Sequence, residues 1–235
     1  MVKYIFISLY FQSWMQKAPM NERRCYVASA TLLDKIYACG GYNAQERLRS
    51  CEIYDPVLDV WGFLPQMTEV RYDAACVAFN NKIYVIGGGD IENHQIHTSV
   101  EIFNPATNEW SFGPSLQVRR SGVKAIAYND KIFVIGGYDG TRRLKTVEVY
   151  DPLVSPYFQL QDKQLLQRRS NFAVTLTDDK IFIMGGYDGR GVTGKTEMYD
   201  DKDKEWKVSK PMKFARSALE TLTLDHYTLN YKDFV

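Results

Sequence analysis

Residues that commonly bind metal ions are sparse in this sequence. It contains three histidines, His94, His97 and His226. His94 and His97 are three positions apart, a spacing that places two side chains on one face only in a helix, and the residues around them show no helical period. A zinc site needs three or four ligands, and no third ligand accompanies this pair. We therefore predict a solvated loop at these histidines and no metal site.

The sequence patterns of nucleophilic and phosphate-transfer enzymes are missing as well. No Gly-x-Ser-x-Gly elbow and no phosphate-binding loop occurs. The glycine doublets of the chain end β-type segments and precede no helix, so we do not expect them to cradle a phosphate group. Asp178 and Asp179 separate two apolar segments, which indicates a two-residue turn rather than a catalytic pair. The prediction is a protein that is not an enzyme and has no cofactor.

Composition narrows the class of protein further. The chain has 235 residues, with 29 Lys and Arg against 28 Asp and Glu, a balance that argues against binding of nucleic acid. Its four cysteines form no CxxC or CxxH pair, which indicates reduced, mostly buried thiols in a cytoplasmic protein. The apolar run at residues 4–11 is too short for a membrane helix and lacks a cleavage site, so we expect a strand there and no membrane contact.

An internal repeat dominates the sequence. Four glycine doublets follow one another at spacings of 47, 49 and 49 residues, and an arginine precedes each by 16 residues. A large aromatic residue follows the first glycine by 14 or 16 residues, with a glutamate two residues before it. Seven residues later comes a tryptophan or, in the third copy, Tyr157. The markers are Gly40, Gly41, Gly87, Gly88, Gly136, Gly137, Gly185 and Gly186; Arg24, Arg71, Arg120 and Arg169; Glu52, Glu101, Glu148 and Glu197; Tyr54, Phe103, Tyr150 and Tyr199; and Trp61, Trp110 and Trp206.

Each copy has the composition of four short strands. In the third copy, residues 123–128, 131–135 and 146–150 are apolar and rich in β-branched residues, and turns or polar loops separate them. A fourth strand is expected around Tyr157. Four antiparallel strands in about 45–50 residues form one blade of a β-propeller. The prediction is an all-β propeller with four complete blades.

The repeated residues have structural roles in such a blade. Glycine doublets allow close approach of neighbouring chain segments, and the aromatic residues and tryptophans can fill the space between twisted sheets. Glutamate and arginine on apolar strands cannot be buried alone. We therefore expect them to form hydrogen bonds inside the protein rather than to take part in catalysis.

These markers resemble the kelch repeat. Gly40-Gly41, the Glu-x-Tyr-Asp-Pro segment at 52–56 and Trp61 carry the resemblance, which covers nearly all of residues 14–220. Residues 18–28 are also similar to the BTB–kelch (kelch-like) adaptors. The resemblance implies a propeller that recognises the substrate of a cullin-3 ubiquitin ligase, with cullin-3 bound through a BTB domain that this chain does not contain. Kelch domains also bind actin, which is the alternative, and some kelch-type propellers are enzymes, which is a third and weaker interpretation.

The two ends depart from the family pattern, in which six blades usually follow BTB and BACK domains. Residues 1–13 are off-pattern, and the repeats occupy 24–61, 71–110, 120–157 and 169–206 within a propeller of residues 14–235. Arg216 opens a partial fifth repeat, but Tyr231-Lys232 stands where its doublet should be. The chain is thus predicted to be a fragment of a six-bladed ring, or a five-bladed propeller in which strands near 216–231 join strands near 3–17.

The remaining function is binding, because propeller loops on one face of a rigid ring commonly carry recognition. One set of face residues follows the doublets, and a second set lies two positions after each repeat arginine. The resemblance to kelch-like adaptors implies peptide contacts at Tyr26, Tyr42, Tyr138, Asn171 and Tyr187. The predicted partner-binding residues are Tyr26, Tyr42, Asp73, Tyr138, Asp139, Arg142, Arg143, Asn171, Tyr187 and Asp188. Loop arginines, Arg142 or Arg143 above all, are expected to attract an acidic motif, and the long loop 89–99 to influence the choice of partner.

Overall fold

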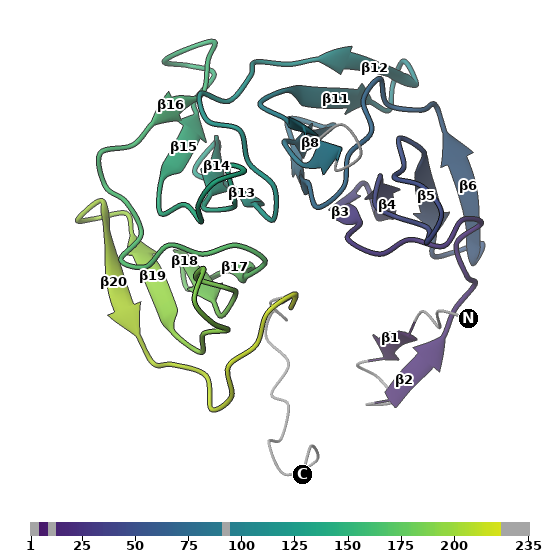
Figure 1. Cartoon of the computed structure of the whole chain (residues 1–235). Coiled ribbons are helices and arrows are strands. Elements are labelled where there is room, and N and C mark those ends of the chain that lie inside the picture. Colours follow the sequence, from purple (N-terminus) through teal and green to yellow (C-terminus); the bar gives the residue numbers. More distant parts are fainter. Residues whose placement is uncertain (1–4, 9–12, 91–94, 222–235) are drawn as a thin grey trace.

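The protein is built from β-strands. The structure, a computed structural model, describes residues 5–8, 13–90 and 95–221. Within these ranges the chain contains no α-helix, and so no helix suited to crossing a membrane. Four separate four-stranded sheets are arranged around a common centre (Figure 1). The predicted all-β propeller with four complete blades is thereby confirmed.

Each blade is an antiparallel meander of consecutive strands. The first blade contains β3 (Ala28–Leu32), β4 (Lys35–Cys39), β5 (Cys51–Asp55) and β6 (Val60–Leu64); the second contains β7 (Ala75–Phe79), β8 (Lys82–Ile86), β11 (Val100–Asn104) and β12 (Glu109–Phe112); the third contains β13 (Lys124–Tyr128), β14 (Lys131–Ile135), β15 (Val147–Tyr150) and β16 (Gln159–Leu160); the fourth contains β17 (Ala173–Thr177), β18 (Lys180–Met184), β19 (Thr196–Asp200) and β20 (Glu205–Ser209). Two-residue turns with positive φ, such as Asp178-Asp179, join the first two strands.

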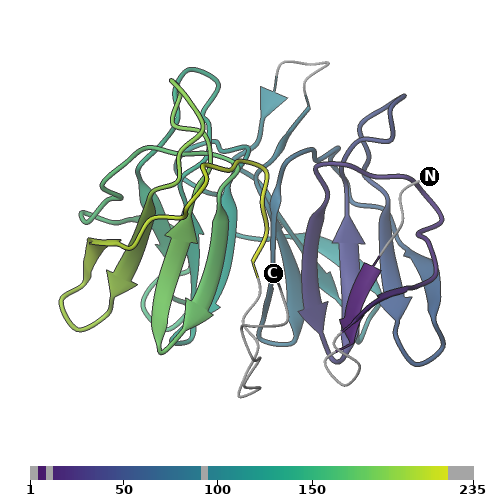
Figure 2. The same ribbon diagram turned by 90° about the horizontal axis from the view of Figure 1, so that it is seen from below.

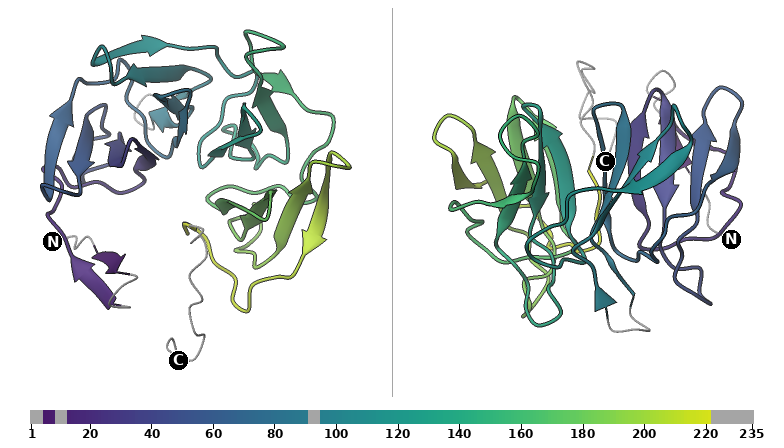
Figure 3. Two further views of the ribbon diagram at one scale, coloured as in Figure 1. Left: turned by 180° about the vertical axis from the view of Figure 1, so that it is seen from behind. Right: turned by 90° about the horizontal axis from the view of Figure 1, so that it is seen from above.

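The blades are placed side by side through their inner strands. In Figures 1 and 3 the first strand of each blade lies towards the centre and the fourth lies at the periphery. Accordingly, β3 contacts β7, β7 contacts β13, and β13 contacts β17. Because the strands alternate in direction, every loop that follows a glycine doublet emerges at the same end of its blade, the upper end in Figure 2. That end carries the candidate site.

Two short sheets lie outside the four blades. β9 (Gly89–Asp90) pairs with β10 (Gln95–Ile96) inside the long loop of the second blade. β1 (Ile5–Ser8) pairs with β2 (Ser13–Gln16), beside the first blade and on the side away from the second (Figure 1). The predicted strand near the N-terminus therefore exists. Residues 222–235 lie outside the described part of the chain, so the composite fifth blade stays a prediction.

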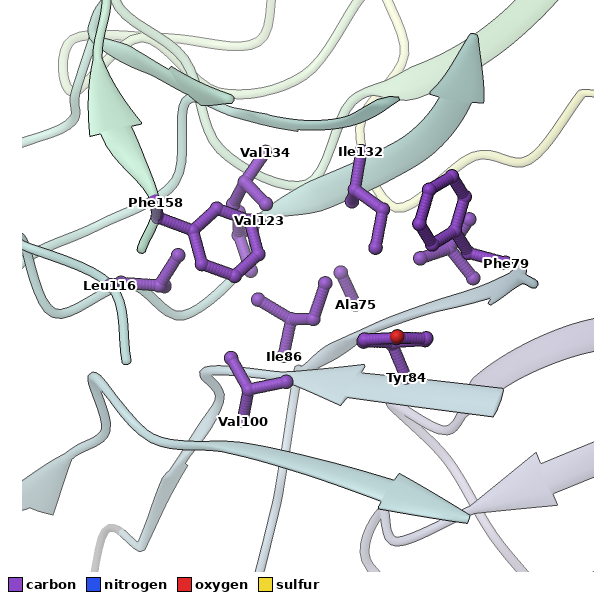
Figure 4. Packing of buried hydrophobic residues seen from close by; sticks show 11 residues of the cluster. Ala75, Phe79, Tyr84, Ile86, Val100, Leu116, Val123, Ile132, Val134 and Phe158 are labelled. Carbon is purple, nitrogen blue, oxygen red and sulfur yellow. The ribbon is translucent and has the colours of Figure 1, made fainter. Parts of the chain in front are cut away.

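Apolar side chains fill the spaces between blades. Figure 4 shows the contact between the second and third blades, where Tyr84 and Ile86 of β8 face Ile132 and Val134 of β14. Ile86, Ile132 and Val134 are fully buried. Equivalent clusters join the first blade to the second and the third to the fourth. Strands β8 and β14 are nearly continuous apolar runs because both of their faces are covered.

The repeat tryptophans extend these contacts to the outer strands. The Trp110 ring lies 5.1 Å from the Phe103 ring, and its indole N–H donates a 2.8 Å hydrogen bond to the carbonyl of Pro65, in the segment between the first two blades. Trp61 packs in the same way at 5.0 Å from Tyr54. Its indole donates to the carbonyl of Ala18. Each of these two tryptophans thus ties an outer strand to the segment that leads into its blade.

The third blade differs from the prediction at its tryptophan position. Tyr157 was expected to replace the tryptophan, but its side chain is exposed. Phe158 is fully buried and lies 5.3 Å from the Tyr150 ring, the same separation as between Trp206 and Tyr199. The loop before β16 is longer in this copy, so the chain enters the outer strand one residue later. The seven-residue spacing therefore selects the wrong aromatic residue.

This correction predicts a contrast between two neighbouring residues. Phe158→Ala removes a fully buried ring, and truncation of this kind costs about 3–5 kcal/mol. For a protein of this size that lowers Tm by roughly 6 °C or more. Tyr157→Ala is the matched control and should leave Tm nearly unchanged. Thermal unfolding followed by circular dichroism measures both, and a larger effect for Tyr157→Ala would restore the original assignment.

Candidate partner-binding face

A buried arginine holds each glycine doublet in place within its blade. The Arg120 guanidinium donates from Nη1 to the carbonyls of Gly136 (2.7 Å) and Thr146 (3.0 Å) and from Nη2 to the Glu148 carboxylate (3.0 Å). Glu148 also accepts the backbone N–H of Gln117 at 2.7 Å. The same contacts recur for Arg24 with Glu52, Arg71 with Glu101, and Arg169 with Glu197. These residues are buried and hydrogen-bonded, as the sequence predicts.

The doublets also connect neighbouring blades. The N–H of Gly137 donates a 2.9 Å hydrogen bond to the carbonyl of Arg169, the arginine of the next blade. Gly136 has φ of +58°, and a Cβ atom there would lie 2.8 Å from the same carbonyl oxygen. The pattern repeats between Gly41 and Arg71, between Gly88 and Arg120, and between Gly186 and Arg216. Glycine is required here by the close passage of the following blade.

Two residues after each arginine, the backbone forms a ladder from blade to blade. The N–H of Asp73 donates to the carbonyl of Tyr26 (3.1 Å), Gly122 donates to Asp73 (2.8 Å), and Asn171 donates to Gly122 (2.8 Å). Ala218 donates to Asn171, which extends the ladder beyond the fourth blade. All five residues have φ between +52° and +58°. The ladder fixes one residue per blade around the centre of this end of the propeller, and the residue of the third blade, Gly122, has no side chain.

The residues that follow the doublets form a second layer above this ladder. Tyr42, Gly89, Tyr138 and Tyr187 pair through their backbones with the residue after each repeat arginine, namely Cys25, Tyr72, Ser121 and Ser170. The loops of successive blades are thus fastened to the inner segments by the same pair of hydrogen bonds.

These two layers surround a depression of about 600 Å³ at the centre of the face. Its lining residues are Tyr26, Tyr72, Asp73, Gly89, Asp90, Gln95, Ile96, Ser121, Tyr138, Gly140, Arg143, Asn171, Tyr187, Ser217 and Ala218. Six of the predicted partner-binding residues are brought together here: Tyr26, Asp73, Tyr138, Arg143, Asn171 and Tyr187. The other four, Tyr42, Asp139, Arg142 and Asp188, do not line this depression. We call it the central pocket.

Arg143 is already engaged by the protein. Its guanidinium carbon lies 4.1 Å from the centre of the Tyr138 ring and 5.1 Å from that of Tyr187, and its Nε donates to the Ser170 hydroxyl at 2.9 Å. Cation–π contacts of this kind contribute about 0.5–2 kcal/mol. Arg143 therefore links two loops and holds both tyrosine rings in fixed positions.

Asp139 and Asp188 support turns. The Asp139 Oδ1 accepts the N–H groups of Thr141 and Arg142, and the Asp188 Oδ1 accepts those of Arg190 and Gly191. The backbone N–H donors hold the pKa of Asp188 below its usual range. For Asp139, partial burial raises the pKa, but the backbone N–H groups and the nearby arginines lower it by more. The pKa of Asp139 is therefore below its usual range. Both carboxylates shape their loops, and their contact with a partner stays a prediction; Asp188 also lines a hollow between the third and fourth blades.

Beside the central pocket, a second hollow of about 720 Å³ runs outward between the third and fourth blades. Tyr138, Arg143 and Tyr187 border both hollows. This basic groove is lined by the cationic side chains of Arg142, Arg143, Lys145, Arg168 and Arg190, and by one acidic side chain, that of Asp188. Arg142 is exposed, with its Nε 3.6 Å from Asp139. Arg142 and Arg143, which are predicted to attract an acidic motif, therefore lie together in this groove.

Sequence reasoning missed the residue directly after each repeat arginine. Tyr72, Ser121 and Ser217 occupy that position and line the central pocket, and Tyr72 packs against Tyr26 with ring centres 4.7 Å apart. The repeat itself could have identified them, since the residue one position after each arginine recurs at the same spacing as the residue two positions after it, which was predicted to lie on the face. Gln95 and Ile96 come from the long loop that was expected to influence partner choice.

The solvated position predicted for His97 is wrong. His97 is buried because its ring lies against the chain between the first two blades, with Nε2 3.0 Å from the Val70 carbonyl oxygen and Nδ1 3.5 Å from Glu69. His94 and His226 lie outside the described residues. Within the described ranges, no group of three or more His, Cys, Asp or Glu could hold a metal ion. Cys39 and Cys51 are buried and Cys25 is exposed, all as free thiols, and burial raises the pKa of Cys51.

Comparison with known protein families and structures identifies the family to which the chain belongs. Residues 67–226, more than half of the chain, match the family model described as the KLHDC2/KLHL20/DRC7 Kelch-repeats domain, and residues 23–68 match the Kelch motif. The chain belongs to the kelch-repeat family. The structure titled "Structure of YjhT" shares the fold of this kelch propeller, with a TM-score of 0.77 over 91% of this chain and 78% of the other, at 15% identity.

Curated relatives match shorter segments of the kelch propeller. The Kelch repeat-containing protein kel-10 of Caenorhabditis elegans is 42% identical over 97 residues, which cover 39% of this chain and 17% of that protein. The Kelch repeat and BTB domain-containing protein F47D12.7 of the same organism is 41% identical, with the same coverage. The influenza virus NS1A-binding protein homolog of Mus musculus is 37% identical over 31% of this chain and 11% of that protein. The matched part is therefore less than a fifth of each relative.

The backbone ladder leads to a prediction at Gly122. A Cβ atom there would lie 2.7 Å from Oδ1 of Asn171, in a backbone conformation with φ of +56°. Gly122→Ala should therefore destabilise the protein by about 1–3 kcal/mol, visible as a lower Tm. At Gly191 a Cβ would meet nothing within 4 Å, so Gly191→Ala is the matched control and should keep the wild-type Tm. Equal Tm values for the two variants would contradict the close packing of the ladder.

Proposed function

We propose that this kelch propeller is a protein-binding module whose central pocket holds a short segment of another protein. The observation that carries the proposal is the pocket itself, in which Tyr26, Tyr72, Tyr138 and Tyr187 from four different loops border one hollow. Tyrosine provides a large contact area and one hydroxyl group at a low cost in side-chain entropy, and it is frequent among the residues that dominate binding energy.

The rigidity of the pocket supports this role. Its walls are fixed by the backbone ladder and by the cation–π contacts of Arg143. A preformed site loses little conformational freedom when a partner binds, and this favours affinity. We also propose that the module itself catalyses no reaction, because the lining of the central pocket contains, among the described residues, no histidine, cysteine or lysine to act as general base or nucleophile.

The cationic side chains of the basic groove favour a bound segment that has acidic residues beside the part held in the central pocket. Arg142 and Arg168 are exposed on either side of the boundary between the third and fourth blades, and both line the groove. Exposed guanidinium groups of this kind bind carboxylates by charge-assisted hydrogen bonds. Arg142, rather than the already engaged Arg143, is the residue available to bind an acidic side chain.

At a finer level, we propose that the propeller selects the substrate of a cullin-3 ubiquitin ligase in the cytoplasm. A relative named for both kelch repeats and a BTB domain supports this role. Residues 18–28 resemble kelch-like protein 10, and membership of that subgroup stays a prediction. The complete gene product should co-precipitate cullin-3. Co-sedimentation of this chain with actin filaments, without binding of cullin-3 by the complete product, would favour the cytoskeletal alternative.

The test of the binding face begins with a displayed library of random peptides selected on the wild-type chain. Enriched peptides are then titrated against Tyr138→Ala and Tyr187→Ala, and at least one variant should lose about 2 kcal/mol of binding energy, roughly thirtyfold in Kd. Leu153→Ala, an exposed apolar residue in the loop between β15 and β16 at the opposite end of the blades, is the control.

Thermal stability separates binding from folding in this test. Both tyrosine variants should stay folded with a Tm lowered by only a few degrees, because their side chains lie on loops and each loses mainly its contact with Arg143. Unchanged affinity in both variants, with loss of affinity in Leu153→Ala, would move the site to the opposite face. Library peptides that bind all three variants as tightly as the wild type would contradict the proposed function.

A further inference from the structure

The central pocket contains a carboxylate that forms no direct ion pair within the described residues. Asp73 lines both the central pocket and a further hollow, which we call the channel and which Gly122 and Lys124 also line. Its two carboxylate oxygens accept hydrogen bonds of 2.9 and 2.8 Å from one donor, the side-chain amide of Asn171. In the part of the chain that the structure describes, no lysine or arginine forms an ion pair with it. This carboxylate is partly buried, and the donor of its hydrogen bonds is a neutral amide, so a cationic partner would stabilise it further.

The nearby cations are engaged elsewhere. Arg143 rests on the rings of Tyr138 and Tyr187 and donates to Ser170. Lys124, in the channel below, is paired with Glu220. Asp90 adds a second acidic residue to the lining of the pocket. The lining of the central pocket thus contains two acidic residues and one arginine, whereas the basic groove beside it has an excess of cations.

Aromatic rings stand next to this carboxylate. Tyr72 is adjacent to Asp73 in the sequence, and its ring packs against Tyr26 at 4.7 Å with an angle of 52° between the ring planes. About half of the Tyr26 surface is exposed. Burial raises the pKa of Tyr72, so its hydroxyl stays protonated and uncharged. Ring faces beside a carboxylate form the kind of site that binds an ammonium or guanidinium group.

The same pocket already contains an example of this recognition. The guanidinium of Arg143 lies over two tyrosine rings on the side of the third and fourth blades. On the other side, Tyr26 and Tyr72 offer a second pair of rings, together with a carboxylate that Arg143 does not contact. The two rings of this second pair differ, because the Arg47 guanidinium carbon lies 5.9 Å from the centre of the Tyr72 ring, whereas none of the cation–π contacts among the described residues involves the half-exposed Tyr26 ring. The hollow between Tyr26 and the Arg143 side of the pocket has space for a long side chain.

We infer that the central pocket takes a basic side chain, lysine or arginine, of the bound segment, with its cation beside the half-exposed ring of Tyr26 and against the carboxylate of Asp73. The inference rests on the proposed function, because it names what that site binds. Acidic residues of the same segment lie outward in the basic groove. The partner is thus recognised by a central basic residue with an acidic flank.

The electrostatics of Asp73 agree with this assignment. Burial raises the pKa of Asp73, and the hydrogen bond from Asn171 together with the more distant charges of Lys124 and Arg143 offsets only part of that effect. A ligand cation in contact with the carboxylate would stabilise its charged form. Binding of the basic side chain therefore gives the carboxylate the direct ion pair that it does not form within the described residues.

The test uses a probe that contains only the predicted anchor. N-acetyl-arginine methylamide is titrated into the full chain and followed by NMR, beside N-acetyl-citrulline methylamide, which has nearly the same shape and no charge. The arginine probe should shift signals of the pocket residues and should bind at least fivefold more tightly than the citrulline probe. Asp73→Asn keeps an oxygen acceptor for Asn171 and should weaken the arginine probe at least fivefold. Asp162→Asn, an exposed acid far from the pocket, should bind the probe as the wild type does.

A second variant keeps the test valid if Asp73→Asn fails to fold. Tyr26→Ala changes a half-exposed ring and leaves the carboxylate in place, and it should weaken the arginine probe as well. Equal binding of the arginine and citrulline probes would overturn the inference, and so would wild-type affinity in both Asp73→Asn and Tyr26→Ala. Library peptides that lose affinity in Tyr138→Ala or Tyr187→Ala would still support the proposed function in that case, so the two failures are distinguishable.

Discussion

The buried guanidinium of the repeat arginine is the interaction on which the rest of the structure depends. Each one, as Arg120 shows, donates to the first glycine of its own doublet and to a buried glutamate. In Arg71, Arg120 and Arg169 the backbone carbonyl also accepts a hydrogen bond from the N–H of the second glycine of the preceding doublet. A guanidinium can be fully buried only when its hydrogen-bonding groups are satisfied and its charge is paired. The blade must therefore close around the arginine with glutamate, doublet and loop all in place, and this requirement recurs in four copies.

The binding face follows from this requirement. Because the doublet and the segment after the arginine are both fixed, the residues immediately beyond them have fixed positions as well. Tyr138 follows a doublet and Asp73 follows an arginine, and the two are brought to one hollow although they come from different blades. The result is a site made of loop residues that has the rigidity of a sheet, and such preorganisation favours recognition of a short segment by a few anchors.

The periodicity of the sequence was enough to predict the blades and the hydrogen-bonded role of the repeated arginines and glutamates. Together with the kelch resemblance and the loop charges, it also pointed to six of the residues around the pocket. Periodicity identifies which positions are equivalent, but not where the side chains point. Asp139 and Asp188 stay predicted contacts, and the structure adds that both accept backbone N–H groups within their own turns. The contact between Asp73 and Asn171 joins residues 98 positions apart, and it exists because Gly122, between them on the ladder, has no side chain. Phe158 was missed because a longer loop shifts the register by one residue.

The most direct test of this account compares two neighbouring arginines. Arg120 is fully buried, whereas Arg119 is exposed. Arg120→Met leaves the Glu148 carboxylate buried without its cation, which costs about 3–5 kcal/mol, so Tm should fall by roughly 10 °C. Amide hydrogen exchange at Gly137 and Tyr138 should become faster at the same time, because the doublet loses its support. Arg119→Met should change neither Tm nor exchange. An Arg120→Met protein with the Tm and the exchange rates of the wild type would contradict the account.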